Sequence, residues 1–383
     1  MIAHINRLLD TAWRNGVLSR PKLDAKAIYA AGSQRLPHVA FTGRRDWLDR
    51  LRELTDALRS EARLNPLGRC IAYGQLVRNV RQRLLLEQLW QDRPEILTMR
   101  LPPPVIVLGH MRSGTTRMQR MLACDPRFAA TRFCDSWCPV PPEGRDWRPM
   151  KAAMALKAIA LFNPRFRSIH PTTATATDEE IGWLGLDWSP TPHNAQWHIP
   201  SFVAAQQTRS ARSNYVLLRQ ILQTWHWHHS ERIRPHILKV PQYMEDIGAL
   251  LAMFPDAKIV RVTRDLPAVV ASSCSLVANQ RAVQSDHVDL HALGREWLER
   301  TRWREQVVTE KLAQHKGIVA TVDFADMDRD WRRSMRGIYR TLSLGLPEAV
   351  LAAMGRHARL EKKDRNAHHY QLADFGLTAD SIG

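Results

Sequence analysis

The stretch Val105-Ile-Val-Leu-Gly-His-Met-Arg-Ser-Gly-Thr-Thr116 decides the fold class of this 383-residue chain. Its first four residues, Val105 to Leu108, form the short β-branched run that is typical of a buried strand. Apolar residues at helical spacing follow the stretch, so the predicted order is strand, loop, helix. In this context the GxxxxG spacing of Gly109 and Gly114 predicts a loop whose backbone N–H groups bind a phosphate-like anion.

The position of the loop's cation separates it from the loop of a nucleotide triphosphatase. Such an enzyme carries lysine after the second glycine, where it reaches the β- and γ-phosphates beside a magnesium ion. Here Thr115 occupies that position and the cation is Arg112, inside the loop. An arginine suits a fixed, bidentate contact with one anionic group. The loop therefore favours phosphate binding without metal-dependent phosphoryl transfer, and a P-loop kinase or NTPase is the alternative enzyme class.

Three further strand candidates lie downstream, at residues 237–240, 258–263 and 318–322. An amphipathic helix is predicted between the first two of them, over residues 247–254. This alternation predicts an α/β fold with a P-loop-like parallel sheet covered by helices.

Composition divides the chain into two predicted parts. From Asp46 to about Trp90, apolar residues recur at helical spacing and are interrupted only at Asn65-Pro66, which indicates an all-helical N-terminal region over 1–100. Residues 101–383 are assigned to the α/β domain. Within it, the segment at about 130–235 is rich in Pro, Trp and His and is predicted to be an inserted, mostly helical part that faces the acceptor.

The charge balance points to an anionic partner. The chain has 55 Lys plus Arg against 38 Asp plus Glu, a formal net charge of +17. Such an excess attracts nucleic acid, an anionic membrane surface or a phosphate-rich small molecule. A basic nucleic-acid-binding module would need a basic tract with interleaved aromatic residues, and the charge is instead spread along the chain. No nucleic-acid partner is therefore predicted.

Cysteine content and hydropathy bear on location. The five cysteines are odd in number and lack CxxC pairs, which favours a reducing, cytoplasmic compartment. No stretch reaches the ~18 apolar residues of a transmembrane helix. The nearest, Met150 to Phe162, is interrupted by Lys151 and Lys157.

A family resemblance rests on two motifs. The loop with its Arg-Ser-Gly-Thr-Thr run resembles the 5'-phosphosulfate loop of sulfotransferases that use 3'-phosphoadenosine 5'-phosphosulfate. The branch with this run includes many bacterial enzymes and the tyrosylprotein sulfotransferases. The second motif, Ile259-Val-Arg-Val-Thr-Arg-Asp-Leu-Pro-Ala-Val-Val-Ala-Ser272, resembles the family's 3'-phosphate element, in which Arg264 and Ser272 hold the 3'-phosphate.

The resemblance implies a donor, 3'-phosphoadenosine 5'-phosphosulfate, a product, 3'-phosphoadenosine 5'-phosphate, and the sulfotransferase fold. It also implies that a C-terminal basic segment contacts the 3'-phosphate, although a solvated charge run is an equal alternative. The predicted cofactor-binding residues are Gly109, His110, Met111, Arg112, Ser113, Gly114, Thr115, Thr116, Arg264, Ser272, Lys362, Lys363 and Arg365.

In-line sulfuryl transfer needs a base for the acceptor hydroxyl and positive charge around the sulfuryl oxygens, and it requires no metal. The resemblance indicates Asp135 as the base, with helix capping as the alternative, and Lys239 and Arg112 as the catalytic cations. The acidic run at 178–180 and His170 are other candidates for the base, so its identity stays open. His226 to His229 offers imidazoles without a carboxylate or cysteine at ligand spacing, and no metal site is predicted.

The class of acceptor is predicted from the inserted segment at about 130–235. Its tryptophans suit a hydrophobic pocket, although core packing is the more frequent use of this residue. The expected acceptor is a small-molecule, phenolic or lipid-like hydroxyl compound. Its predicted contacts are His170, Asp178, Glu179, Trp183 and Trp188.

Overall fold

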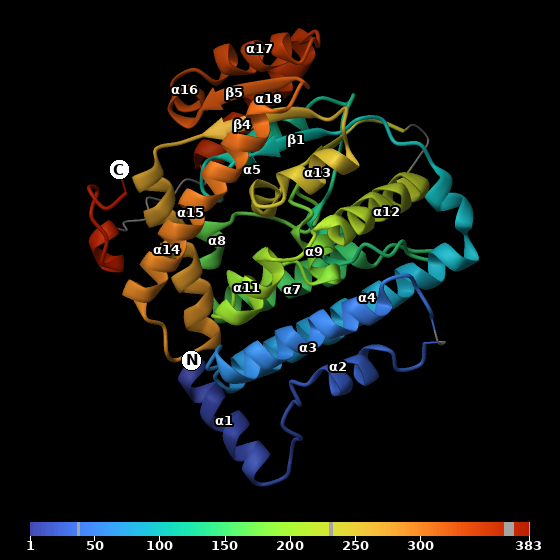
Figure 1. Cartoon of the computed structure of the whole chain (residues 1–383), viewed down its shortest axis with the longest axis vertical. Helices are drawn as coiled ribbons and strands as arrows, with labels where there is room; N and C mark the ends of the chain where they lie inside the picture. Colours follow the sequence, from blue (N-terminus) through green and yellow to red (C-terminus); the bar gives the residue numbers. More distant parts are fainter. Residues whose placement is uncertain (37–38, 230–232, 364–370, 383) are drawn as a thin grey trace.

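A five-stranded parallel sheet forms the centre of the computed structural model, which describes residues 1–36, 39–229, 233–363 and 371–382 (Figure 1). The strand order is β2-β3-β1-β4-β5, and β1 lies in the middle with Val105 paired to Ile237 on one side and to Lys258 on the other. The strand bounds are β1 Val105–Leu108, β2 Ala129–Ala130, β3 His236–Leu238, β4 Lys258–Thr263 and β5 Val319–Asp323. The predicted α/β fold with a parallel sheet is confirmed.

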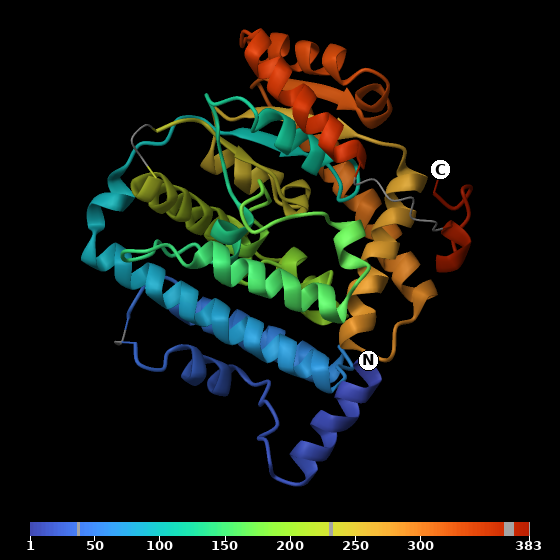
Figure 2. The same ribbon diagram turned by 180° about the vertical axis from the view of Figure 1, so that it is seen from behind.

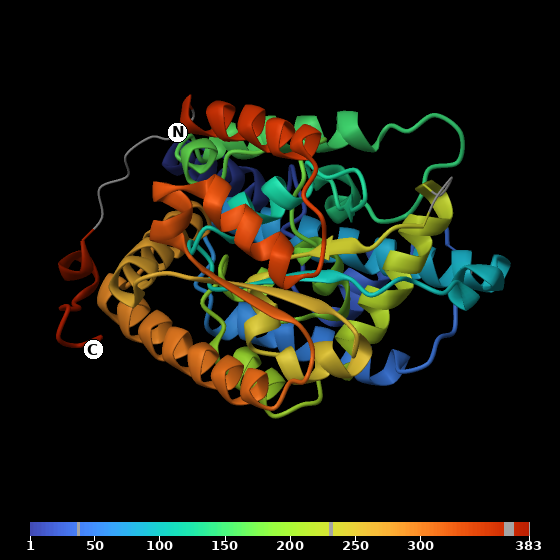
Figure 3. The same cartoon turned by 90° about the horizontal axis from the view of Figure 1, so that it is seen from above.

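Helices cover both faces of the sheet (Figure 3). On one face, Val105 and Val107 of β1 pack in a core shared with α5, α17 and α18, and on the other, Ile106 and Leu108 pack in a core shared with α13 and α15. The bounds of these helices are α5 Thr115–Leu122, α13 Ile247–Met253, α15 Leu290–Ala313, α17 Trp331–Thr341 and α18 Glu348–Lys363. Because both faces are buried, β1 is apolar at every position.

The first hundred residues contain helices, as predicted: α1 Ile2–Arg14, α2 Ala25–Gly32, α3 Arg44–Ser60, α4 Pro66–Asp92 and the 3-10 helix η1 Pro94–Thr98. The predicted break is real, because the Asn65 side chain accepts a hydrogen bond from the Gly68 N–H at 2.8 Å and caps α4. These helices do not pack alone. Their core includes Trp188 and Phe202 of the inserted segment.

The segment between β2 and β3 is mostly helical. Its elements are α6 Phe133–Trp137, α7 Arg148–Phe162, α8 Phe166–Ile169, α9 Ile181–Leu184, η2 Gly185–Asp187, α10 Thr191–Asn194, α11 Pro200–Gln207 and α12 Arg212–His229. The remaining elements are η3 Pro241–Met244, α14 Leu266–Gln284, α16 Phe324–Arg329 and η4 Leu372–Phe375. Among the described residues, no helix combines the length and apolar character needed to cross a membrane.

Candidate active site

Four strands are each followed by a candidate site residue at the same edge of the sheet. The loop at Gly109 follows β1, Lys239 follows β3, Arg264 follows β4 and Phe324 follows β5. Because the strands are parallel, their carboxyl ends meet at one edge, where open α/β sheets bind their ligands. The two sequence motifs are therefore neighbours in the fold.

The loop closely approaches the rest of the fold. A Cβ atom on Gly109 would lie 2.7 Å from the Val262 carbonyl oxygen, and one on Gly114, whose φ is +92°, would lie 2.5 Å from a ring carbon of Phe324. Only glycine fits at these two positions. Arg112 also has a left-handed φ of 66°, which costs a non-glycine residue about 1 kcal/mol. Such strain is typical of functional loops.

Arg112 links the two motifs. Its Nε donates a hydrogen bond to Ser272 Oγ at 3.0 Å, and its guanidinium donates to the Ile169 carbonyl at 2.7 Å. Arg264 donates to the Arg112 carbonyl at 2.7 Å, and its guanidinium carbon lies 4.4 Å from the centre of the Phe324 ring. The structure thus brings together Arg112, predicted to contact the 5'-phosphosulfate, with Arg264 and Ser272, predicted to contact the 3'-phosphate.

Lys239 connects the loop to the acidic run. It is buried, and its Nζ donates to Thr116 Oγ1 at 2.9 Å and to Glu179 Oε2 at 3.1 Å. Helix α5, which begins beside the loop, holds the backbone before Glu179 in place. Gln119 donates to the Asp178 carbonyl and Arg120 to the Thr177 carbonyl, both at 3.1 Å. Glu179 therefore contacts Lys239, whose ammonium group also contacts the first turn of α5.

Glu180 is fully buried behind this pair. Its Oε2 accepts hydrogen bonds from the Lys239 N–H at 2.8 Å and from the Tyr243 hydroxyl at 3.4 Å. Burial raises the pKa of Glu180 to about 8. The carboxyl group is therefore protonated at neutral pH and positions the Lys239 backbone without adding charge to the site.

Replacing Glu180 by glutamine is expected to flatten the pH dependence of stability. The folded protein keeps the proton of Glu180 up to about pH 8, whereas the ordinary pKa of glutamate is 4.5. Between these values the native state binds more protons than the unfolded state, so the free energy of unfolding of the wild type falls as pH rises. Glutamine has no such proton. Urea unfolding across this pH range checks the difference, and equal slopes for the two proteins would contradict it.

Asp178 and His170 form a second pair beside helix α5. His170 Nε2 lies 3.1 Å from Asp178 Oδ2, and the Thr172 hydroxyl donates to the same oxygen at 2.7 Å. Burial acts to raise the pKa of Asp178, but the attraction of His170 and these hydrogen bonds lower it overall. Donor atoms of His170, Asp178 and Glu179 lie within 4.8 Å of one another, a group that could hold a metal ion. The expectation of metal-free chemistry stays a prediction.

Asp135 occupies a different environment. It is fully buried at the start of α6, and its carboxylate accepts two hydrogen bonds of 2.8 Å from Arg132 and one of 3.3 Å from the Trp225 indole, while Arg148 lies 3.4 Å away. Burial acts to raise the pKa of Asp135, but the two arginines lower it overall. These contacts describe a structural ion cluster, and a role as the base stays a prediction.

Asp135→Asn is expected to lower the free energy of unfolding by about 3 kcal/mol, because Arg132 and the buried Arg148 lose the buried carboxylate between them and keep only the partly exposed Asp146. The matched control is Asp146→Asn, which removes a partly exposed carboxylate that also contacts Arg148, and a smaller loss is expected there. Urea unfolding measures both. A variant of Asp135 with wild-type stability and greatly reduced turnover would support the base role instead.

The two predicted acceptor tryptophans lie in the core. Trp183 is 1% exposed and its indole donates to the Asp135 carbonyl at 2.8 Å. Trp188 is fully buried, with its ring centre 5.2 Å from that of Trp47. Both tryptophans pack in the core, which was the alternative to an acceptor pocket. Contact of either residue with the acceptor stays a prediction. The side chains of Lys362 and Lys363 and all of Arg365 lie outside the described residues.

Sequence reasoning did not find Glu305, the acidic partner of His110 in the loop and of Arg261 in β4. His110 Nε2 lies 3.0 Å from Glu305 Oε2, and Arg261 pairs with the same carboxylate. Burial lowers the pKa of His110, and Glu305 opposes this shift only in part. No local signal points to Glu305, which lies on α15, far along the chain. Phe324 was detectable in principle, since it directly follows a strand.

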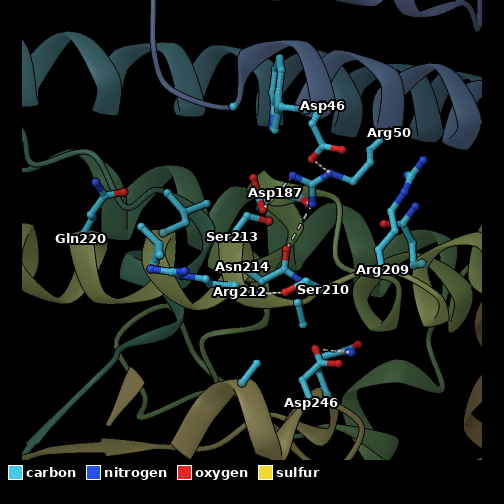
Figure 4. Close-up of a pocket in the computed structure, with 18 of the residues that line it drawn as sticks. Asp46, Arg50, Asp187, Arg209, Ser210, Arg212, Ser213, Asn214, Gln220 and Asp246 are labelled. Carbon is cyan, nitrogen blue, oxygen red and sulfur yellow. Dashed lines mark hydrogen bonds and ion pairs between the residues drawn. The ribbon is translucent and has the colours of Figure 1, made fainter. Parts of the chain in front are cut away.

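A cavity of about 980 Å³ lies apart from the loop, between the N-terminal helices and α12, α13 and α15 (Figure 4). In Figure 4, Arg50 reaches from α3 between Asp46 and Asp187, and it donates to Asp187 Oδ2 at 3.0 Å. Asp246 faces it from the far wall, where burial raises the pKa of this carboxyl to about 7. The described residues that line the cavity include none from 109–116. It is therefore separate from the loop at 109–116.

Comparison with known proteins gives concordant findings. The model of the sulfotransferase family matches residues 103–348. The omega-hydroxy-beta-dihydromenaquinone-9 sulfotransferase Stf3 of Mycobacterium tuberculosis is 24% identical over 313 residues, which cover 74% of each chain. Two solved structures have similar folds. Sulfotransferase STF1 from Mycobacterium tuberculosis matches at 23% identity with a TM-score of 0.81, covering 93% of this chain and 96% of that one. Sulfotransferase STF9 from Mycobacterium avium matches at 22% identity with a TM-score of 0.83, covering 94% of each.

Proposed function

The chain belongs to the sulfotransferase family, and we propose that it uses 3'-phosphoadenosine 5'-phosphosulfate as donor and the hydroxyl group of a lipid-like molecule as acceptor. When bound, the donor supplies an activated sulfuryl group. The observation that carries the proposal is the convergence of Arg112, Ser272 and Arg264 at the carboxyl edge of the sheet.

The residues at this edge fit such a donor. Two guanidinium groups and a hydroxyl group are the donors that proteins use for phosphate and sulfate oxygens, and arginine binds them through two parallel N–H groups. The backbone of the loop can approach an anion closely because Gly109 and Gly114 have no Cβ. Arg112 would hold the phosphosulfate, while Arg264 and Ser272 would hold the 3'-phosphate.

Glu179 is the base that the geometry favours. Its carboxylate is partly accessible and contacts Lys239, which also contacts Thr116 beside the loop. A hydroxyl group placed between the loop and Glu179 could therefore give its proton to this carboxylate. The Lys239 ammonium would neutralise negative charge that develops next to Thr116. His170 is the second candidate, because Asp178 orients its ring.

The acceptor class rests on a relative. The printed name of the Mycobacterium tuberculosis relative states that it acts on omega-hydroxy-beta-dihydromenaquinone-9, a hydroxyl compound with a long apolar chain. The predicted lipid-like hydroxyl acceptor agrees with that substrate class.

The test of the donor is calorimetry with 3'-phosphoadenosine 5'-phosphate. The wild type is expected to bind it, and Arg264→Ala to weaken binding by about 10- to 100-fold, the loss of one hydrogen-bonded charge. Binding of adenosine 5'-phosphate, which lacks the 3'-phosphate, is expected to change little. Arg329→Ala, which removes an exposed surface arginine, is the control. Equal losses for both nucleotides would contradict the role of Arg264, and magnesium-dependent turnover of ATP would support a kinase or NTPase instead.

A further inference from the structure

Helix α7 carries a stripe of exposed apolar side chains. Trp147 at its start is 44% exposed, and Met150, Met154 and Leu161 are 49%, 62% and 58% exposed. Their spacing of three, four and seven residues places them on one face of the helix. These four residues, called here the α7 stripe, are four of the thirteen exposed large apolar residues of the described chain. Large exposed apolar surfaces mark interaction sites.

Basic side chains border the α7 stripe on both sides. With 100° per residue, Lys151 and Lys157 project about 60° to either side of Met154, and both are exposed. No acidic residue occurs in α7. Arg145 adds a further cation, with its guanidinium 4.3 Å from the centre of the Trp147 ring. An exposed apolar strip with a cationic border suits contact with the surface of an anionic bilayer, where lysine stems cover apolar surface and their ammonium groups reach the phosphates.

The helix has the right length to lie on a membrane and is too short to cross one. Its 15 residues span about 22 Å, whereas a spanning helix needs about 20 apolar residues. Tryptophan is enriched where a protein meets the headgroup layer, and Trp147 stands at one end of the α7 stripe. Figure 2 shows α7, in bright green, running across the face of the molecule turned toward the viewer.

The α7 stripe is connected to the candidate active site. Helix α7 leads directly into the short helix α8, whose last residue, Ile169, offers the carbonyl oxygen that accepts a hydrogen bond from Arg112 at 2.7 Å. His170 follows immediately and contacts Asp178. A surface that binds membrane at α7 would therefore bring the bilayer close to the loop and to the acidic run.

We propose that the α7 stripe binds the enzyme to an anionic membrane surface, from which it takes its lipid-like acceptor. This inference rests on the acceptor class of the proposed function. It also gives a role to positive charge that the donor does not need, since the chain carries a net charge of +17. A second copy of the chain is the competing occupant. Two stripes face to face would bring the lysines of both copies together with no acid on either helix to pair with them, which disfavours that arrangement.

Vesicle flotation with the full chain tests the proposal. Vesicles contain equal parts of phosphatidylglycerol and phosphatidylcholine, or phosphatidylcholine alone, and no sulfuryl donor is present. The wild type is expected to bind the anionic vesicles more tightly, and the double variant Met154→Glu and Leu161→Glu to lose at least about tenfold in affinity. Lys151→Glu with Lys157→Glu is expected to reduce the preference for anionic lipid, and an unchanged preference would contradict the role of these lysines. Leu360→Glu, which changes a leucine of similar exposure in α18, is the matched control and should bind as the wild type does.

Two further measurements separate the possible failures. Thermal unfolding shows whether the variants fold, and transfer to a short-chain, water-soluble alcohol without vesicles should be unchanged in the stripe variants. Wild-type protein that transfers to this alcohol but does not bind vesicles would overturn the membrane proposal. So would a dimer in sedimentation velocity that the stripe variants dissociate. Vesicle binding that depends on the stripe, without transfer to any alcohol, would support the membrane surface and contradict the proposed acceptor.

Discussion

Arg112→Gly is expected to lower kcat/KM by about 100- to 1,000-fold, the usual loss when one preorganised donor to a developing anion is removed. Arg112 is the cation within the loop, and its guanidinium is held by Ser272 Oγ and by the Ile169 carbonyl. Glycine is chosen because Arg112 has a φ of 66°, which glycine adopts without strain. Glycine removes the guanidinium and adds no backbone strain, so a loss of activity in this variant cannot come from a newly strained loop.

Two companion variants sharpen this experiment. Arg112→Ala should lose as much activity as Arg112→Gly and be about 1 kcal/mol less stable than that variant, because alanine, like the native arginine, is strained at this φ. Arg112→Lys keeps the charge but not the planar fork, so an intermediate loss is expected if two parallel N–H groups bind one anion. Steady-state kinetics and thermal unfolding measure both effects. Nearly full activity of the folded Arg112→Gly protein would refute the assignment of the anion site.

Glu179→Gln is expected to lower kcat by about 100- to 10,000-fold, the contribution of a positioned general base. The substitution keeps the size of the side chain and removes its ability to take a proton. Affinity for 3'-phosphoadenosine 5'-phosphate should change little, because Glu179 contacts Lys239 rather than Arg112 or Arg264. Single-turnover kinetics and calorimetry measure the two quantities separately.

The same experiment compares the other candidate bases. His170→Gln should reduce kcat less than Glu179→Gln if the imidazole only contacts Asp178. Glu179→Asp, which retains a carboxylate one methylene shorter, should recover part of the rate. If Glu179→Gln retains the wild-type kcat while a stable Asp135→Asn protein loses it, Asp135 is the base.

Local sequence patterns predicted the sheet well but incompletely. The strand predicted at 258–263 is observed with the same bounds, and the helix predicted at 247–254 ends one residue earlier, at Met253. The edge strand β2 was not predicted. It consists of Ala129 and Ala130 alone and pairs with His236 and Ile237 of β3. A two-residue strand has no periodicity of its own, and only its partner defines it.

The candidate site shows the same division between local and distant information. The loop motif and the strand-end position of Arg264 are local, and both were visible because phosphate-binding loops impose glycine positions and strand order. Local sequence could not predict which of the candidate acids lies beside the loop. Asp135 and Glu179 are both carboxylates near helix starts in the sequence, yet one is enclosed by arginines and the other contacts Lys239 beside the loop.

The sequence by itself determined the fold class and located the glycine loop and the two motifs that meet beside it, because periodicity and glycine spacing are properties of short stretches; anion binding by that loop stays a prediction. Only the tertiary structure decided which side chains are buried and which distant groups meet. It placed Glu179 against Lys239, gave Asp135 two arginine partners, and left the apolar face of α7 exposed. The physical reason is that burial and pairing depend on contacts between elements far apart in the chain, which no local pattern encodes.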